Sequence, residues 1–211
     1  MKVCEIFASI QGESTYAGMP CTFVRLTGCN LRCTYCDTQY AYDEGKDLSE
    51  DDIVSEVSRL GLKTVEITGG EPLLQSDVHN LMKRLLDDGH RVLIETNGSM
   101  EIDAIDRRAV IILDIKTPGS GMAREMRISN LAHLKSSDEL KFVISTREDY
   151  EWSKEFIHSH GLAGKCNILF SSVTGTLDPQ ELSQWIIEDR LYVRLNLQIH
   201  KYLFGPDRRG V

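Results

Sequence analysis

Three cysteines lie close together in one short stretch of the sequence. Cys29, Cys33 and Cys36 have the spacing C-x3-C-x2-C, directly after a β-branched run. Three thiolates on one tight loop can converge on a single metal centre, and soft sulfur favours an iron–sulfur cluster or zinc over hard cations. Zinc would need a fourth ligand, and no nearby cysteine or histidine supplies one. A [4Fe-4S] cluster held by three cysteines would leave one iron open to a ligand.

The other cysteines are isolated. Cys4 and Cys166 have no cysteine neighbour, and Cys21 lies at the opposite end of the β-branched run from Cys29. We therefore expect these three to be core residues, and we expect no auxiliary cluster. The chain begins without an apolar stretch long enough for a signal peptide, so the expected compartment is the cytosol, where cysteines stay reduced.

A second motif, Thr68-Gly69-Gly70-Glu71-Pro72, follows the next β-branched run. Paired glycines let a ligand approach the backbone closely and expose its N–H and C=O groups. We expect Glu71 to accept a hydrogen bond from a ligand amine. Alone the motif would indicate only a turn, but beside the cysteine triple it indicates a binding site.

Composition and charge narrow the class of protein. The chain has 211 residues, 41% of them hydrophobic, and a net charge of −8, which is typical of one folded domain covering residues 1–211. Because no basic excess is available to neutralise phosphates, we expect no nucleic-acid partner. The longest apolar run, Ala109–Leu113, is far too short to span a membrane.

Short β-branched runs alternate with amphipathic stretches along the chain. Strands are expected at 22–27, 64–68, 91–95, 110–116, 140–144, 168–171 and 191–197. Strand–helix alternation predicts a parallel sheet with helical crossovers, and seven strands are too few for an eightfold barrel. The expected fold is therefore α/β, a partial β/α barrel of about six to seven mostly parallel strands, with an open doubly wound sheet as the alternative.

Capping signals place the helices between these strands. Ser49 with Asp52 forms a capping box, Thr146 caps a later helix, and Asp178-Pro179 opens another. A further helix is expected over 74–85, and the acidic segment between 95 and 110 is expected to be helical. Residues 3–10 are expected in a hairpin at the sheet edge, and 117–137 in a functional loop.

In a barrel of this type, ligands bind at the C-terminal ends of the strands. The polar segments that follow the expected strands would therefore gather at one mouth. These segments are 29–38, 68–71, 95–97, 114–116, 171–172 and 198–200.

The two motifs together, with Tyr35 before the last cysteine, resemble the radical S-adenosylmethionine (SAM) superfamily. Finer matches resemble its deazapurine-forming family; they are Ile10-Gln11-Gly12-Glu13-Ser14, Arg25, Cys36-Asp37-Thr38 and Gln198-Ile199-His200-Lys201. That resemblance implies a lyase converting 6-carboxy-5,6,7,8-tetrahydropterin to a 7-carboxylated deazaguanine with loss of ammonia. The reaction belongs to queuosine and deazapurine biosynthesis.

The resemblance also implies the cofactors and partners. Cys29, Cys33 and Cys36 would hold the [4Fe-4S] cluster, whose open iron chelates SAM. An external one-electron reductant such as flavodoxin or ferredoxin would drive cleavage of SAM, and the resulting 5′-deoxyadenosyl radical would take a hydrogen from the pterin. The cofactor supplies the difficult chemistry, and the protein supplies position and water exclusion. A homodimer is implied as well.

Residue roles follow from the same resemblance. The cofactor-binding set would be Tyr35, Cys36, Asp37, Gly70, Glu71, Asp114, Ile115, Lys116 and Ser172. The substrate-binding set would be Ile10, Gln11, Gly12, Arg25 and Thr68. Thr38 would place its hydroxyl on a Mg²⁺ ion beside the substrate carboxylate, with substrate oxygens and water completing the octahedron. Arg25 and Thr38 would be the catalytic residues.

Strand alternation adds an expectation for Arg25. Its neighbours Val24 and Leu26 are apolar, so Arg25 points to the opposite, interior face, where a charge needs a partner. We expect the substrate carboxylate to be that partner, through two parallel N–H bonds, so that Arg25 is unpaired without substrate.

Other functions remain as alternatives. Within the superfamily, the alternative is an activase of a glycyl-radical enzyme. From another class, an iron–sulfur electron carrier or a zinc-binding module could use the three cysteines. Such modules need four ligands and leave the Gly-Gly-Glu-Pro run without a purpose.

Overall fold

A mixed sheet forms the centre of the fold. The computed structural model describes residues 1–206 and 208–211, and in them the strand order is β3-β1-β2-β4-β5-β6-β7-β8-β9. β2 and β4 to β9 pair in parallel along the sheet, whereas β1 is antiparallel to β2 and β3. The strands are β1 Lys2–Ile10, β2 Pro20–Leu26, β3 Lys46–Asp47, β4 Thr64–Gly69, β5 Arg91–Thr96, β6 Val110–Ile115, β7 Glu139–Ile144, β8 Asn167–Ser172 and β9 Arg194–Leu195.

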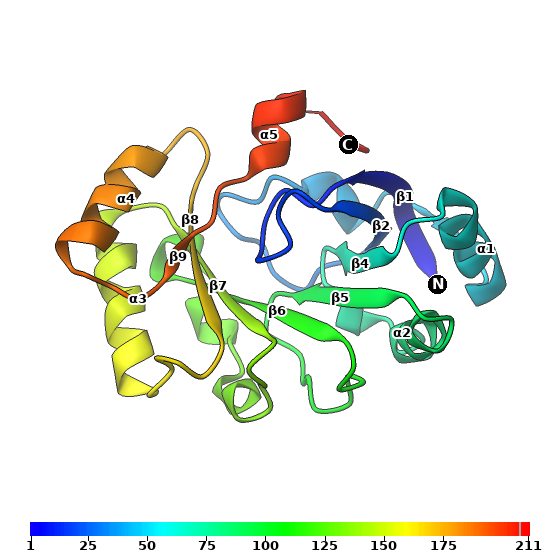
Figure 1. The fold of residues 1–211 in the computed structure, drawn as a ribbon, viewed down its shortest axis with the longest axis horizontal. Coiled ribbons are helices and arrows are strands. Elements are labelled where there is room, and N and C mark those ends of the chain that lie inside the picture. The colour runs from blue at the N-terminus through cyan, green and yellow to red at the C-terminus, as the bar shows by residue number, and fades with distance from the viewer. Residues whose placement is uncertain (207) are drawn as a thin grey trace.

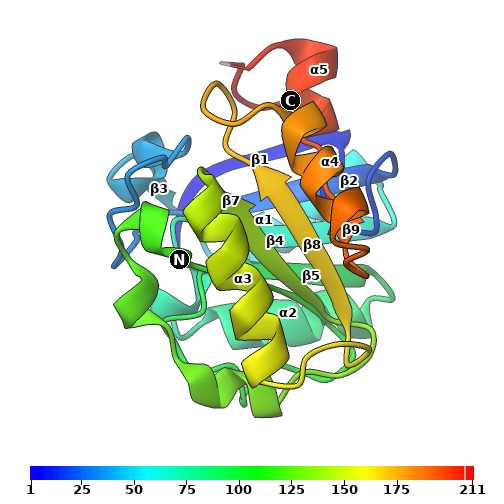
Figure 2. The same ribbon diagram turned by 90° about the vertical axis from the view of Figure 1, so that its left-hand side faces the viewer.

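Helices α1 to α4 cover the outside of the curved sheet, whereas α5 lies over the cavity on its inner side. The helices are α1 Glu50–Leu60, α2 Val78–Asp87, α3 Arg147–Ser159, α4 Pro179–Glu188 and α5 Ile199–Phe204, with short 3-10 helices at Gln39–Tyr42, Pro72–Leu74, Pro118–Ser120, Ala123–Glu125 and Ile128–Ala132. Figure 1 shows α1 and α2 outside one half of the sheet, and α5 at the end where the C-terminus lies. Figure 2 shows α3 and α4 in front of β7 and β8. This arrangement is the expected partial β/α barrel.

The helix starts follow the capping signals in the sequence. The Ser49 hydroxyl accepts from the Asp52 N–H, and the Asp52 carboxylate accepts from the Ser49 N–H, both at 3.1 Å. The Thr146 hydroxyl likewise accepts from the Asp149 N–H. Each such cap contributes about 1 kcal/mol, so the local sequence is enough to define where these helices begin.

The two faces of the sheet differ in chemistry. In β4, Val65 and Ile67 are fully buried in the core formed with the helices, whereas Glu66 and Thr68 point to the inner face. This follows from the period of two in a strand, which sends successive side chains to opposite faces. An inner face with charged side chains is costly to bury, which indicates a ligand site there.

Two sequence expectations about the elements are wrong. The segment between β5 and β6 forms turns in place of a helix, because the Asp106 carboxylate accepts from the Arg108 N–H and competes with helical hydrogen bonds. The last strand is short, since β9 pairs only with β8 and Tyr192 before it is 97% exposed. The 3–10 hairpin is confirmed as β1 paired with β2, although β3 covers part of its outer edge. None of the described helices is long and apolar enough to cross a membrane.

Candidate active site

One cavity of about 620 Å³ opens along the inner face of the sheet and the C-terminal ends of its strands. Its volume is typical of a site for small molecules. Glu71 and Ile115 are the predicted site residues that do not line it. Those that do are Ile10, Gln11, Gly12, Arg25, Cys29, Cys33, Tyr35, Cys36, Asp37, Thr38, Thr68, Gly70, Asp114, Lys116 and Ser172.

The cysteine loop leaves β2 and faces this cavity. Its start is held by a hydrogen bond from the Gly28 N–H to the Ala41 carbonyl (2.8 Å), and its middle by one from the Thr34 N–H to the Ser120 carbonyl (3.1 Å). The Cys29 sulfur accepts from the Leu31 N–H at 3.4 Å. Burial raises the pKa of Cys33, against the smaller effect of the nearby Lys116 charge.

The donor set fits an iron–sulfur cluster better than a single metal ion. Among the described residues, no three His, Cys, Asp or Glu side chains are placed to hold one ion together. A [4Fe-4S] cluster has no such requirement, because each cysteine binds a different iron. The thiolates of Cys29, Cys33 and Cys36 on one loop suit such a cluster.

The Gly-Gly pair allows the second motif to approach the cysteine loop. A Cβ atom on Gly70 would lie 2.2 Å from the Gly28 carbonyl oxygen and 2.6 Å from the Cys29 Cβ. Only glycine can occupy this position without moving the loop backbone. Gly70 and Cys29, 41 positions apart in the sequence, thus bring the two motifs into direct contact.

Glu71 has a different role from the one that we expected. It is fully buried, and its carboxylate accepts from the Thr96 hydroxyl (2.9 Å), the Asn97 N–H (2.7 Å) and the Leu73 N–H (3.0 Å). Burial raises its pKa, although these hydrogen bonds favour the charged form. With its oxygens occupied in this way, Glu71 joins the loops after β4 and β5 and does not receive a ligand amine.

The end of β6 contributes a charged pair with an open acceptor. Lys116 Nζ lies 2.6 Å from Asp114 Oδ2, while Asp114 Oδ1 is buried without a hydrogen-bond partner among the described residues. Burial disfavours the charged form of Lys116, but Asp114, Cys33 and Tyr35 together outweigh this and raise the lysine pKa. An unpartnered buried acceptor fits the amine or hydroxyl donors of a ligand such as SAM. The side chain of Ile115, which lies between them, packs in the core on the helix side and does not line the cavity.

Comparisons with known proteins agree with this geometry. The model of the radical SAM superfamily matches residues 23–129. A 7-carboxy-7-deazaguanine synthase from Koribacter versatilis is 47% identical over 228 residues, covering 100% of both chains. One from Chlorobaculum tepidum is 45% identical over 214 residues, covering 100% of this chain and 97% of the relative. The chain belongs to the 7-carboxy-7-deazaguanine synthase family of the radical SAM superfamily.

The fold agrees with a solved structure. The crystal structure of QueE from Escherichia coli has a TM-score of 0.79 and 24% sequence identity over 93% of each chain. This likeness confirms the partial barrel that the sequence predicts. The synthase family also accounts for the cysteine loop, since the superfamily implies a [4Fe-4S] cluster and SAM.

Arg25 already has an ion-pair partner in the protein, whereas we expected it to be unpaired without substrate. Its Nε lies 2.8 Å from Glu5 Oε1, and the two residues face each other across β1 and β2. The Tyr40 hydroxyl also donates to Glu5 Oε1, at 3.0 Å. Burial alone would lower the pKa of Arg25, but Tyr40 and Glu5 raise it. The guanidinium has five donors, so the fork can bind a further carboxylate while Glu5 holds Nε.

A buried charge network at the floor of the site was not predicted. Lys141 Nζ lies 2.6 Å from Glu13 Oε2 and 2.7 Å from Glu95 Oε1. Lys141 and Glu66 are charged residues at inward positions of apolar strands, and that alternation was the signal available in the sequence. Burial opposes the charge of Lys141, but Glu13 and Glu95 outweigh it and raise its pKa.

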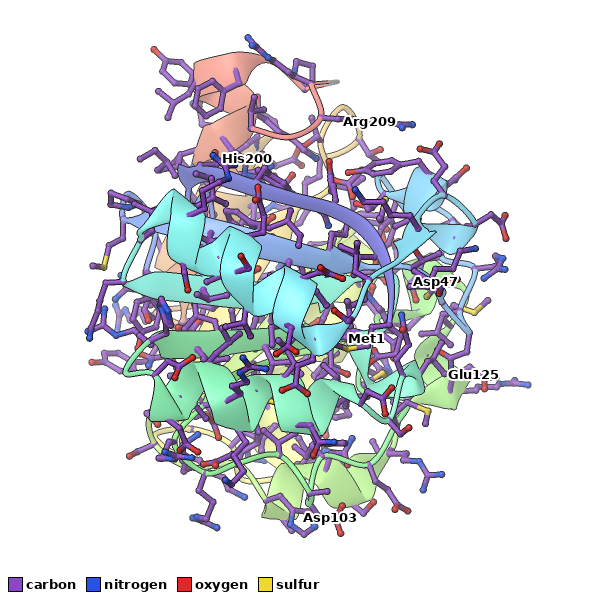
Figure 3. The ribbon with its side chains drawn as sticks, turned by 90° about the vertical axis from the view of Figure 1, so that its right-hand side faces the viewer. Met1, Asp47, Asp103, Glu125, His200 and Arg209 are labelled. Atoms are coloured by element: carbon purple, nitrogen blue, oxygen red, sulfur yellow. The ribbon has the colours of Figure 1, made fainter. Side chains whose placement is uncertain are left out.

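The C-terminal segment completes the cavity in this synthase family member. The Ile199 N–H donates to the Gly12 carbonyl (2.9 Å), and a Cβ on Gly12 would lie 1.9 Å from His200 Nδ1. His200, undecided from sequence, therefore packs directly on the predicted pterin-binding loop. Figure 3 shows His200 and Arg209 at the same end of the molecule, and both line the cavity.

Proposed function

We propose that this chain converts 6-carboxy-5,6,7,8-tetrahydropterin to 7-carboxy-7-deazaguanine with loss of ammonia, in queuosine and deazapurine biosynthesis. The observation that carries the proposal is one shared cavity. The cysteine loop, the Gly70 backbone and Arg25 all open onto it. Whole-length relatives of this name support the reaction.

At one end of the cavity, the chain would hold the radical-generating cofactors. Cys29, Cys33 and Cys36 would ligate the cluster, and SAM on the open iron supplies the radical that starts the ring contraction. The open oxygen of Asp114 suits a SAM donor. Tyr35, whose pKa is raised to about 12 by burial, stays neutral and can pack against the adenine. Asp37, Gly70, Lys116 and Ser172 would complete this set.

At the other end, the chain would hold the pterin. Arg25 would bind the substrate carboxylate through the donors that Glu5 leaves free. Ile10, Gln11, Gly12 and Thr68 would surround the ring. The Thr38 hydroxyl, which donates to Asp37 Oδ1 at 3.0 Å, keeps lone pairs for a Mg²⁺ ion shared with the substrate carboxylate and water.

The proposed partners follow from the same chemistry. An external one-electron reductant, flavodoxin or ferredoxin, would supply the electron, in the cytosol. A homodimer would cover apolar side chains that are exposed in the C-terminal part of the chain, from α4 to α5. These are Ile187, Tyr192, Leu197 and Tyr202, and sedimentation of the intact protein tests this arrangement.

Anaerobic turnover tests the function directly. Reconstituted protein with SAM, Mg²⁺, reductant and the carboxy-tetrahydropterin is expected to release the deazaguanine product and ammonia. A glycyl-radical activase would leave the pterin unchanged while cleaving SAM in the presence of its protein substrate. An electron carrier or zinc module would form no 5′-deoxyadenosine, and either result overturns the proposal.

A further inference from the structure

Glu66 lies deeper in the cavity than Arg25, beside an aromatic wall. Strand register pairs Phe7 with Phe23, and Phe23 with Glu66, while Arg25 pairs with Thr68. All five line the cavity. Two residues of strand separate the two levels, a distance of about 7 Å. The Phe7 and Phe23 rings stack with centroids 5.1 Å apart and planes 13° apart, so a flat apolar surface adjoins the Glu66 carboxyl.

Gln11 fixes the hydrogen-bonding state of Glu66. The Gln11 amide oxygen accepts from the Glu13 N–H at 2.8 Å, which sets the orientation of the amide. Its Nε2 therefore faces Glu66 and donates to Oε2. An oxygen that accepts this bond is a poor place for a proton, so a proton on this carboxyl belongs on Oε1.

The charges around Glu66 favour the neutral acid. Lys141 pairs with Glu13 and Glu95, and no ion pair within residues 1–206 and 208–211 involves Glu66. Burial and the charges of Glu95 and Glu13 raise the pKa of Glu66, against the smaller effects of Lys141 and Arg25. The other titratable groups that line the same cavity are Asp37, Asp114, Lys116, His200, Lys201, Arg208 and Arg209, together with Cys29, Cys33, Cys36, Tyr35, Tyr40 and Tyr42.

We propose that Glu66, oriented by Gln11, is the residue that recognises the pyrimidine ring of the substrate, by pairing with its lactam edge while Phe7 and Phe23 contact the ring. This inference rests on the proposed function, and it identifies which edge of the substrate ring forms hydrogen bonds with the protein. Arg25 and Thr68, nearer the mouth of the cavity, bind the substrate carboxylate end. Phe23 and Glu66, deeper in the cavity, bind the pyrimidine ring.

Protonation decides which edge a carboxyl group can read. A neutral acid offers a donor and an acceptor side by side, which match the C4 carbonyl and the N3–H of a pterin. An ionised carboxylate offers only acceptors, which match the N3–H and the 2-amino group. The Gln11 contact and the lack of an ion pair to Glu66 among the described residues favour the first pairing. A glutamine at this position also offers one donor and one acceptor.

Equilibrium binding of 6-carboxypterin, followed by quenching of its fluorescence, tests the assignment. Glu66→Leu is expected to weaken binding about 10- to 100-fold, the effect of two lost hydrogen bonds. Glu66→Gln is expected to bind within about threefold of wild type, because the amide preserves the pairing. Equal binding by Glu66→Leu and wild type would overturn the proposal.

An analogue without the 2-amino group identifies the edge. With 4-oxo-3H-pteridine-6-carboxylate, Glu66→Leu is expected to lose the same factor as with 6-carboxypterin, since the lactam edge is unchanged. If Glu66→Gln binds as weakly as Glu66→Leu, and the loss disappears with the analogue, the carboxylate reads the 2-amino edge and our assignment is wrong.

The pH profile provides a separate readout. Wild-type affinity is expected to fall more steeply with rising pH than the affinity of Glu66→Gln, because the Glu66 carboxyl loses the proton that it donates whereas the amide keeps its donor. The same slope in both proteins would overturn the proposal. Cluster absorption and the unfolding midpoint verify that each variant folds. Wild-type protein that neither binds nor converts the pterin would instead refute the proposed function.

Discussion

Lys201 Nζ lies 2.7 Å from Asp37 Oδ2, which joins helix α5 to the cysteine loop across 164 positions of sequence. Burial opposes the charge of Asp37, but Lys201 outweighs it and lowers the pKa of Asp37 to about 2. The C-terminal helix is thus fastened to the residue between Cys36 and Thr38.

Removing this tether should loosen α5. Lys201→Met is expected to speed amide exchange in residues 199–204 and to raise the KM for the pterin about two- to fivefold, a magnitude typical of a partly exposed ion pair. Lys83→Met, which removes the remote exposed pair with Asp87, is the matched control. Unchanged exchange in α5 would show that other contacts hold it.

The same tether has a defined pH dependence. Its stabilising contribution is complete above the unfolded-state pKa of aspartate, near about 4. It is lost as the pH falls through about 2, the pKa of Asp37 in the folded protein. Comparing wild type with Lys201→Met in cluster-free protein should therefore show a difference in stability above about pH 4 that vanishes in acid.

Cluster binding should separate the cysteines into two groups. Replacement of Cys29, Cys33 or Cys36 by Ala is expected to abolish iron binding and visible cluster absorption. Cys21→Ala should retain both, because Cys21 is fully buried and burial raises its pKa well above the usual thiol range. Loss of the cluster in Cys21→Ala would contradict the assignment.

Magnesium dependence should reveal the role of Thr38. Thr38→Ala is expected to lower the rate of ring contraction and to raise the Mg²⁺ concentration required, while SAM still binds. Thr38→Ser keeps the hydroxyl and should restore most of the activity. A Thr38→Ala enzyme with wild-type rates at all Mg²⁺ concentrations would rule out this site.

The planar fork of Arg25 should matter more than its charge. Arg25→Lys is expected to weaken pterin binding by about 1–3 kcal/mol, because lysine cannot hold Glu5 and the substrate carboxylate in one plane. SAM cleavage without pterin should continue. Calorimetric titration measures the affinity, and an unchanged value would mean that Arg25 serves only to pair with Glu5.

Glu71 should contribute mainly to the stability of the folded protein, with little direct effect on ligand binding. Glu71→Ala is expected to lower the free energy of unfolding by about 2–4 kcal/mol, because it leaves the buried donors of Thr96 and Asn97 without an acceptor. Urea denaturation of cluster-free protein measures this. The exposed Glu101→Ala is the control and should change stability by less than about 0.5 kcal/mol. Equal stability of the two variants would contradict the structural role of Glu71 and would support the original expectation that it binds a ligand.

Local patterns in the sequence were enough to place most elements and the cluster. The β-branched run at 64–68 predicts strand β4, and the capping box at Ser49 predicts the start of α1. The cysteine spacing predicts a cluster loop because its ligands are close together in the chain. Each of these features depends on neighbours within a few residues.

Tertiary structure decided which side chains share the cavity and in what charge state. The sequence by itself determined that Arg25 and Glu66 lie in strands and that Glu71 lies just after one. Only the register of β1 with β2 brings Glu5 to Arg25, and only the approach of the β5 loop encloses Glu71. Partners that are far apart in sequence depend on how the crossovers pack. Burial and neighbouring charge then decide whether a carboxyl binds ligand, supports the backbone or keeps its proton.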